Sequence, residues 1–151
     1  MNPLSSLPFV LSAALFASTA SAQSAPACPT LPSDAANDLR WSILKTDSAL
    51  LCRAMDAAGQ EAFAVTVARK SPFKPTGSLR EESGQMQGQK LWWYRTEIAG
   101  RPDELVRETL VKLSADRLVH VFIRTSDKDT MGRYQRVVQG LQFDAGNVAQ
   151  R

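Results

Sequence analysis

Hydrophobic and polar positions alternate along much of this chain, which is the pattern of β-strands with one buried face. Residues 39–43 alternate in this way, and after a turn at 46–47 a second apolar run covers residues 50–55. A further turn at 56–59 leads into residues 62–68, which are rich in β-forming side chains. This pattern predicts three strands joined by short turns, that is, a β-meander.

The second half of the chain contains three more runs with strand character. Residues 91–98, LWWYRTEI, form the clearest strand, and two runs of equal length, 105–113 and 117–125, flank a short polar turn. Such a pair predicts a β-hairpin. A helix over 105–113 is the competing interpretation, because Pro102 suits a first helical position. We favour the hairpin, because the apolar strand around residues 118–123 needs a neighbour.

Two segments lack any periodic pattern. Residues 23–37 are rich in Pro, Ser and Ala and are typical of an extended leader. Residues 69–78 contain two prolines and one glycine, and the stretch 81–90 that follows is polar. We therefore expect the longest irregular region between residues 69 and 90, where a loop of this length is either mobile or functional.

The end of the chain has the pattern of an amphipathic helix. Ser126 and Asp129 resemble a capping box, and Gly140 is placed to stop the helix. The apolar face is formed by Met131, Tyr134, Val137, Val138 and Leu141. Residues 141–143 are expected to add a short edge strand before a polar tail, 144–151.

The predicted fold is therefore a single α+β domain over residues 38–143, with an antiparallel β-sheet, made of a meander plus a hairpin, and a C-terminal α-helix packed on one face. From Leu91 to Phe143, the order of a strand hairpin, a terminal helix and a final short strand ending in an aromatic residue resembles that of PsbP-like domains. The resemblance implies a role in binding other proteins rather than in catalysis.

The N-terminus predicts export. Residues 1–22 contain no charged side chain, have an apolar stretch from Leu7 to Phe16, and end in Ala20-Ser21-Ala22. Signal peptidase cuts after such a small-x-small pattern, so cleavage is expected after Ala22 and the mature protein is expected in the periplasm. The apolar stretch is shorter than the roughly 20 residues that span a bilayer, so no permanent membrane anchor is predicted.

Two cysteines and a mild positive charge remain in the mature chain. In an oxidising compartment, Cys28 and Cys52 are expected to form a disulfide that fastens the leader to the domain, stabilising the fold by roughly 3.5 kcal/mol in the chain-entropy model. The 18 basic and 15 acidic residues give a net charge of +3, which slightly favours acidic partners.

The sequence offers few parts for catalysis. His120 is the one histidine and is flanked by Val119 and Val121, so we expect a structural, hydrogen-bonded side chain. Without a second histidine or a free cysteine, Cys-His catalysis and zinc hydrolysis lack their parts. The segment 127–132 begins like a calcium loop, but Met131 replaces an oxygen ligand.

Carboxylate pairs are the remaining catalytic candidates. These pairs are Glu81 with Glu82, Asp103 with Glu104, and Glu97 with Glu108. Basic residues lie near each pair, so salt-bridged surface roles are favoured. We therefore predict a protein that is not an enzyme and that has no metal and no cofactor.

A binding surface is the stronger candidate. Trp, Tyr and Arg are enriched at binding hot spots, and residues 92–95 combine all three types beside a basic loop. The predicted binding residues are Arg69, Lys70, Phe73, Lys74, Arg80, Trp92, Tyr94 and Arg95. The competing interpretation, given equal weight, places Trp92, Trp93 and Tyr94 in the core under covers on both sheet faces.

The combined features predict a periplasmic protein-binding module, in the form of an inhibitor or immunity protein that blocks an antibacterial effector enzyme. The expected partner is another protein in the periplasm or envelope. Nucleic acid is disfavoured as a partner by the export signal and the small net charge. A groove that binds glycans is a remaining alternative. The alternatives are a structural or assembly factor of a cell-envelope complex and, below it, a carboxylate-dependent cell-wall hydrolase.

Overall fold

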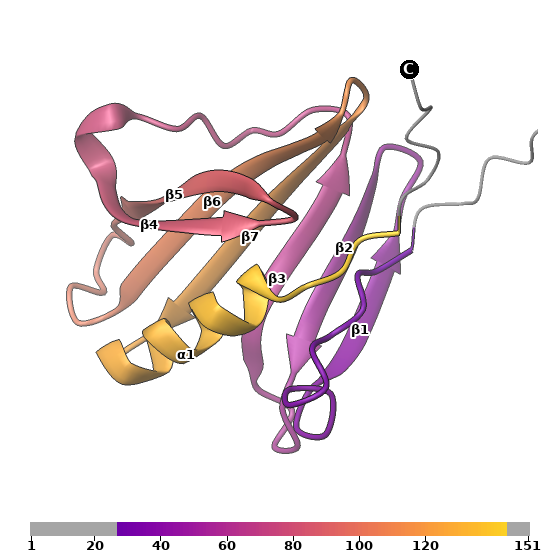
Figure 1. Ribbon diagram of the computed structural model, residues 1–151. Coiled ribbons are helices and arrows are strands. Elements are labelled where there is room, and N and C mark those ends of the chain that lie inside the picture. The colour runs from indigo at the N-terminus through magenta and orange to yellow at the C-terminus, as the bar shows by residue number, and fades with distance from the viewer. Residues whose placement is uncertain (1–26, 145–151) are drawn as a thin grey trace, which may run out of the picture.

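Seven strands, one α-helix and one short 3-10 helix, η1 (Gly77–Leu79), form the part of the chain that the computed structural model describes, residues 27–144 (Figure 1). The strands are β1 (Arg40–Lys45), β2 (Ala49–Met55), β3 (Glu61–Ala68), β4 (Arg80–Met86), β5 (Gln89–Thr96), β6 (Leu105–Ser114) and β7 (Arg117–Thr125), and the helix is α1 (Lys128–Gln139). All strands pair antiparallel in one sheet with the order β1-β2-β3-β7-β6-β5-β4. This agrees with the predicted antiparallel α+β class.

The polar stretch 81–90 is mostly strand, so the expectation of an irregular region there is wrong. β4 and β5 are joined at Gln87 and Gly88, which both have positive φ values, 52° and 74°, as a two-residue hairpin turn of type I′ requires. β4 is an edge strand that pairs only with β5. Apart from the buried Met86 at its end, its side chains are exposed or meet polar groups, so it lacks the alternation by which the other strands are recognised.

Residues 105–114 are strand, which excludes the helical interpretation of this segment.

At the start of α1, Asp127 is the N-cap, and its carboxylate accepts a hydrogen bond of 2.7 Å from the Thr130 N–H. The expected cap at Ser126 is therefore wrong by one residue. The expected edge strand over 141–143 is reduced to one bridge between Thr30 and Gln142.

Gly140 ends the helix as predicted, but for a different physical reason. Its φ of −86° is ordinary right-handed backbone, so no left-handed conformation requires glycine. A Cβ atom at this position would lie 2.8 Å from Cγ of Pro32. Glycine is needed because the leader passes closely over the end of the helix.

The helix and the leader cover the same side of the sheet, which we call the helix face (Figure 1). Phe63, Val65 and Val121 point to this side and are buried with Met131 and Val138 of α1.

The leader is fastened there by the predicted disulfide between Cys28 and Cys52, whose Cα atoms are 5.8 Å apart. It is also held by the Trp41 indole N–H, which donates to the Pro29 carbonyl at 2.8 Å. From residue 33 to residue 38 the leader turns rather than extends.

The strand order forces one segment across the other side of the sheet, the opposite face. The chain leaves β3 near the middle of the sheet and must reach β4 at the far edge, beyond β7, β6 and β5. Residues 69–79 make this passage, and we call them the crossing segment. α1 occupies the helix face and contacts both β7 and β4. The crossing segment passes over the opposite face, where its Phe73 contacts Tyr94 of β5 and His120 of β7.

No helix among residues 27–144 is long and apolar enough to cross a membrane. The predicted signal peptide, residues 1–22, lies outside the described residues, as does the polar tail beyond Asp144.

Candidate functional site

A hydrogen-bonded His–Glu pair lies at the centre of the opposite face. His120 on β7 has Nε2 3.0 Å from Glu108 Oε1 on the neighbouring strand β6. The Thr96 hydroxyl on β5 donates to the other oxygen of the same carboxylate. His120 is thus a hydrogen-bonded sheet-surface residue, and Glu108 pairs with it rather than with Glu97.

The protonation of this pair follows from its surroundings. Burial raises the pKa of the Glu108 carboxyl, but the hydrogen bonds from His120 and Thr96 and the charge of His120 together outweigh burial, so the pKa of Glu108 lies below its ordinary value. The carboxyl is therefore ionised at neutral pH. An ionised carboxylate only accepts hydrogen bonds, so the His120 Nε2 carries the proton.

The crossing segment is fixed on this pair by Phe73. The Phe73 ring stacks on the His120 imidazole, with centroids 5.1 Å apart and an interplanar angle of 14°. It also meets Tyr94 edge to face at 5.8 Å. Tyr94 is only 9% exposed, because Phe73 covers it. These contacts hold the centre of the crossing segment against β5 and β7.

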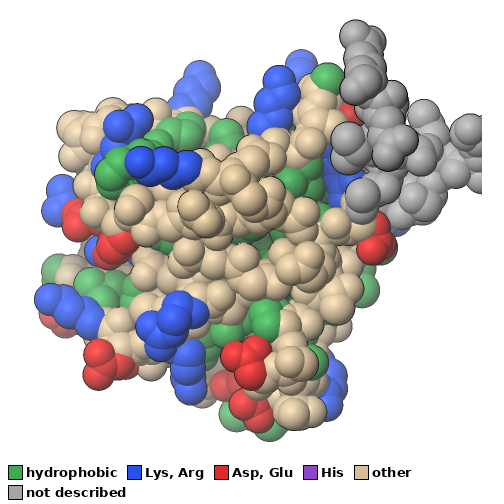
Figure 2. Space-filling view, in the orientation of Figure 1, with side chains coloured by type: hydrophobic (Ala, Val, Ile, Leu, Met, Phe, Trp, Pro, Cys, Tyr) green, Lys and Arg blue, Asp and Glu red, His purple; other side chains and the backbone are tan. Residues whose placement is uncertain are grey.

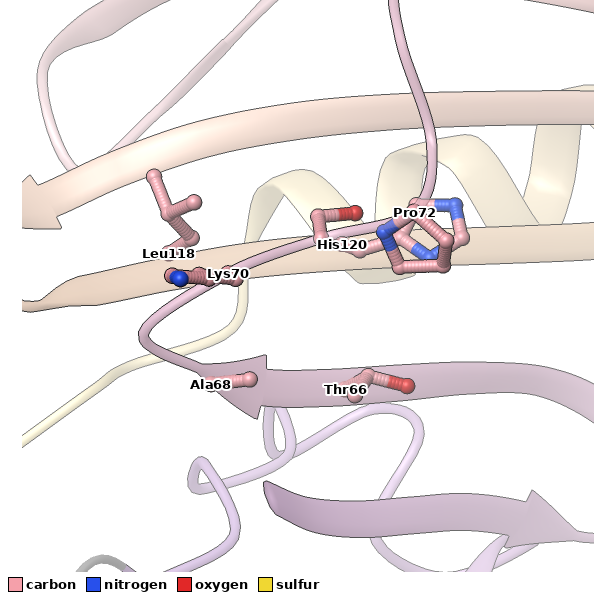
Figure 3. Close-up of a pocket in the computed structure, with 7 residues that line it drawn as sticks. Thr66, Ala68, Lys70, Pro72, Leu118 and His120 are labelled. Atoms are coloured by element: carbon pink, nitrogen blue, oxygen red, sulfur yellow. The ribbon is translucent and has the colours of Figure 1, made fainter. Parts of the chain in front are cut away.

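A small pocket opens between the crossing segment and the sheet (Figure 3). Its volume is about 100 Å³. The floor comes from β3 and β7 and the rim from the crossing segment, and the lining residues are Thr66, Ala68, Lys70, Ser71, Pro72, Leu118 and His120. Figure 3 shows Lys70 and Pro72 on the crossing segment in front of Leu118 and His120. Most of the lining is apolar, with a few polar groups that converge on it, as is typical of ligand sites.

Trp92 forms a second feature of the opposite face. Its half-buried ring lies between two cations, with the Arg80 guanidinium 5.3 Å and the Lys90 ammonium 5.8 Å from the ring centroid. Among residues 27–144, no carboxylate lies within ion-pair distance of Arg80, Lys90, Lys70 or Lys74. We call these four cations and Trp92 the basic surface. Within the described residues, its charge is therefore not neutralised by an ion pair.

The structure divides the predicted binding residues between the two faces. Lys70, Phe73, Arg80, Trp92 and Tyr94 come together on the opposite face or on the crossing segment, while Arg69 and Lys74 lie exposed in that segment. Arg95 has the other orientation, because side chains alternate along a strand. It shares the helix face with the fully buried Trp93 and pairs with Glu81 at 3.7 Å.

Basic and acidic side chains are mixed on the helix face. Figure 2 shows that side with basic and acidic side chains scattered around its rim. Arg107 pairs with Glu82 at 2.9 Å and with Glu81 at 3.8 Å. The carboxylates of Glu81 and Glu82 are therefore held in ion pairs, as the sequence-based interpretation favoured.

A wider hollow of about 450 Å³ lies at the other end of the sheet, between the leader and β1. Its one charged lining residue is Arg40, whose guanidinium donates to the main-chain carbonyls of Ala36 and Leu39. The hollow therefore offers a single charged group, already bound to the main chain, and we place the candidate site on the opposite face, where several cations gather. In the described part of the chain, no cluster of three or more His, Cys, Asp or Glu residues could hold a metal ion.

Sequence reasoning missed Lys90 and the link from His120 through Glu108 to Thr96. Because side chains alternate along a strand, Lys90 lies on the same side as Trp92, and this alternation could have identified Lys90 from the sequence. The His–Glu link had no such signal, since it depends on the pairing of β6 with β7.

No protein-family model, curated protein or solved structure matches the chain. The resemblance to PsbP-like domains stays an expectation.

Proposed function

We propose that this protein is a non-catalytic binding module of the periplasm that caps an acidic surface of another protein. The observation that carries the proposal is the half-buried Trp92 between Arg80 and Lys90. An aromatic anchor flanked by cations that form no ion pair within residues 27–144 is the arrangement expected of a hot spot for a partner of opposite charge.

The rigidity of the surrounding surface supports this proposal. Phe73 packs on Tyr94 and His120, and Pro72 and Pro75 restrict the backbone on either side of it. A segment that is already ordered loses little conformational entropy when a partner docks. The finer form of the proposal is an inhibitor or immunity protein that blocks an antibacterial effector enzyme, with an envelope assembly factor as the alternative.

A pull-down from periplasmic extract tests the proposal. The mature protein is immobilised beside a variant with Arg80→Glu and Lys90→Glu, which reverses both charges around Trp92. An acidic protein captured by the parent and not by the folded variant is the expected result. Recovery of one enzyme supports the inhibitor, and recovery of a multi-protein complex supports the assembly factor. Equal capture by both proteins would contradict the proposed surface.

A hydrolase is the second candidate, favoured by one specific observation. Ser71 and His120 line the same pocket, and His120 is oriented by the Glu108 carboxylate. A hydroxyl, an imidazole and a carboxylate are the parts of a nucleophilic triad. Ester hydrolysis by the mature protein that is lost in both Ser71→Ala and His120→Gln, with the fold intact, would favour this candidate over the binding module.

A further inference from the structure

We propose that the pocket between the crossing segment and strands β3 and β7 is a socket for one carboxylate side chain of the partner protein. This inference rests on the proposed function and specifies what the partner must present. The proposal stands on the size of the pocket, on the donors that line it and on Lys70, which forms no ion pair within residues 27–144.

The size of the pocket restricts its occupant. About 100 Å³ is well below the roughly 300–1,000 Å³ of sites for cofactors and drug-sized ligands. It is a few times the roughly 30 Å³ that one water occupies in the liquid. A single aspartate or glutamate side chain has the right scale, and a larger substrate does not.

The polar groups of the lining are suited to an acceptor with a negative charge. The Lys70 ammonium carries three N–H donors. The Ser71 oxygen accepts a hydrogen bond of 3.2 Å from the Phe73 N–H, which leaves the hydroxyl proton of Ser71 free to donate. The Thr66 hydroxyl on β3 adds a further donor. Charge-assisted hydrogen bonds from such groups are stronger than those between neutral groups.

The protein's own carboxylate does not neutralise these donors. Glu108 does not line the pocket, and its two oxygens are hydrogen-bonded to His120 and Thr96. No acidic side chain of residues 27–144 lies within ion-pair distance of Lys70.

The charge of the pocket favours one negative charge over two. A carboxylate matches the one lysine in the lining. A phosphate dianion would carry a second negative charge, for which the lining holds no second lysine.

A pair of blocked tripeptides tests the socket without knowledge of the partner. Acetyl-Ala-Glu-Ala-amide and acetyl-Ala-Gln-Ala-amide have almost the same shape and differ in charge. Each is titrated into isotopically labelled mature protein, and amide chemical shifts are followed by NMR. Inorganic phosphate is titrated as a separate arm. The variants are Lys70→Met and, as a control with the same change of charge, Lys128→Met, which lies exposed at the start of α1.

We expect the Glu peptide to shift the amides of residues 70–72 and 118–120 in a saturable way. The Gln peptide should bind about tenfold more weakly, the loss typical of one charge-assisted hydrogen bond. Lys70→Met should remove this difference, and Lys128→Met should retain it.

Three outcomes would overturn the socket: equal affinity for both peptides, no shift in the pocket at the solubility limit of the Glu peptide, or tighter binding of phosphate than of the Glu peptide. Failure here is distinguishable from failure of the proposed function. A partner that is captured through Arg80 and Lys90 and binds Lys70→Met as tightly as the parent would remove the socket alone. A socket that binds the Glu peptide in a protein that captures no partner would remove the capping role alone.

Discussion

The His120 imidazole contacts Glu108 through its edge, with Nε2 3.0 Å from the carboxylate, and Phe73 through its face, with the two ring centroids 5.1 Å apart. One side chain therefore links strands β6 and β7 to the crossing segment. The position of the pocket rim depends on this link, because Lys70, Ser71 and Pro72 lie just before Phe73 in the chain.

Acid should weaken the fold through Glu108. Its pKa is lower in the folded protein than in the unfolded chain, so the ionised carboxylate contributes stability above its unfolded pKa, and this contribution is lost as the pH falls through the folded pKa. In urea unfolding, Glu108→Gln should be less stable than the parent at neutral pH, and the difference should shrink in acid.

The control for this experiment is Glu97→Gln, which removes the same charge from an exposed residue just after β5. It should change the free energy of unfolding little at neutral pH. If the deficit of Glu108→Gln were the same at neutral pH and in acid, the ionised pair with His120 would not be its source.

Two glycines of the C-terminal helix region should respond oppositely to a methyl group. Gly140→Ala places Cβ 2.8 Å from Cγ of Pro32 and should destabilise the protein by about 1–3 kcal/mol, the usual cost of overpacking. Gly132→Ala meets only Arg136 Nη1 at 3.6 Å and should stabilise the helix by up to about 1 kcal/mol. Thermal unfolding of both variants measures this, and equal effects would contradict the close passage of the leader over Gly140.

Reduction of the disulfide between Cys28 and Cys52 should lower the free energy of unfolding by roughly 3.5 kcal/mol, because the leader then gains freedom in the unfolded chain. Urea unfolding with and without reductant measures the change. Thiol titration of the unreduced mature protein should find no free thiol, and two free thiols would contradict the bridge.

Trp92 and Arg95 should differ in partner binding, although the sequence placed them in one surface. Trp92→Ala should weaken binding by about 2 kcal/mol, or roughly thirtyfold, because it removes the aromatic anchor. Arg95→Ala should leave binding unchanged, since Arg95 lies on the helix face beside Glu81. A partner captured by pull-down provides the assay, and circular dichroism checks the fold of both variants. A larger loss for Arg95→Ala would move the interface to the other side of the sheet.

The regular elements with one buried face could be predicted from local pattern. The alternation in β2, β3 and β7 and the apolar stripe of α1 arise from the periods of strand and helix, and both periods are encoded in neighbouring residues. β4 was missed because this edge strand buries only Met86 at its end, so its sequence shows no alternation of apolar and polar residues. Most residues of the candidate surface could be named from the sequence for the same local reason, since the aromatic and basic types cluster in two short segments.

The sequence by itself determined the antiparallel α+β class, the disulfide and the residue types of the candidate surface. Only the tertiary structure decided which of them share a face. The passage from β3 to the far edge of the sheet places residues 69–79 on the side away from α1, where Phe73 reaches His120 and Tyr94, and strand alternation turns Arg95 away. The physical reason is that contacts between strands distant in sequence depend on sheet order, which no local period encodes.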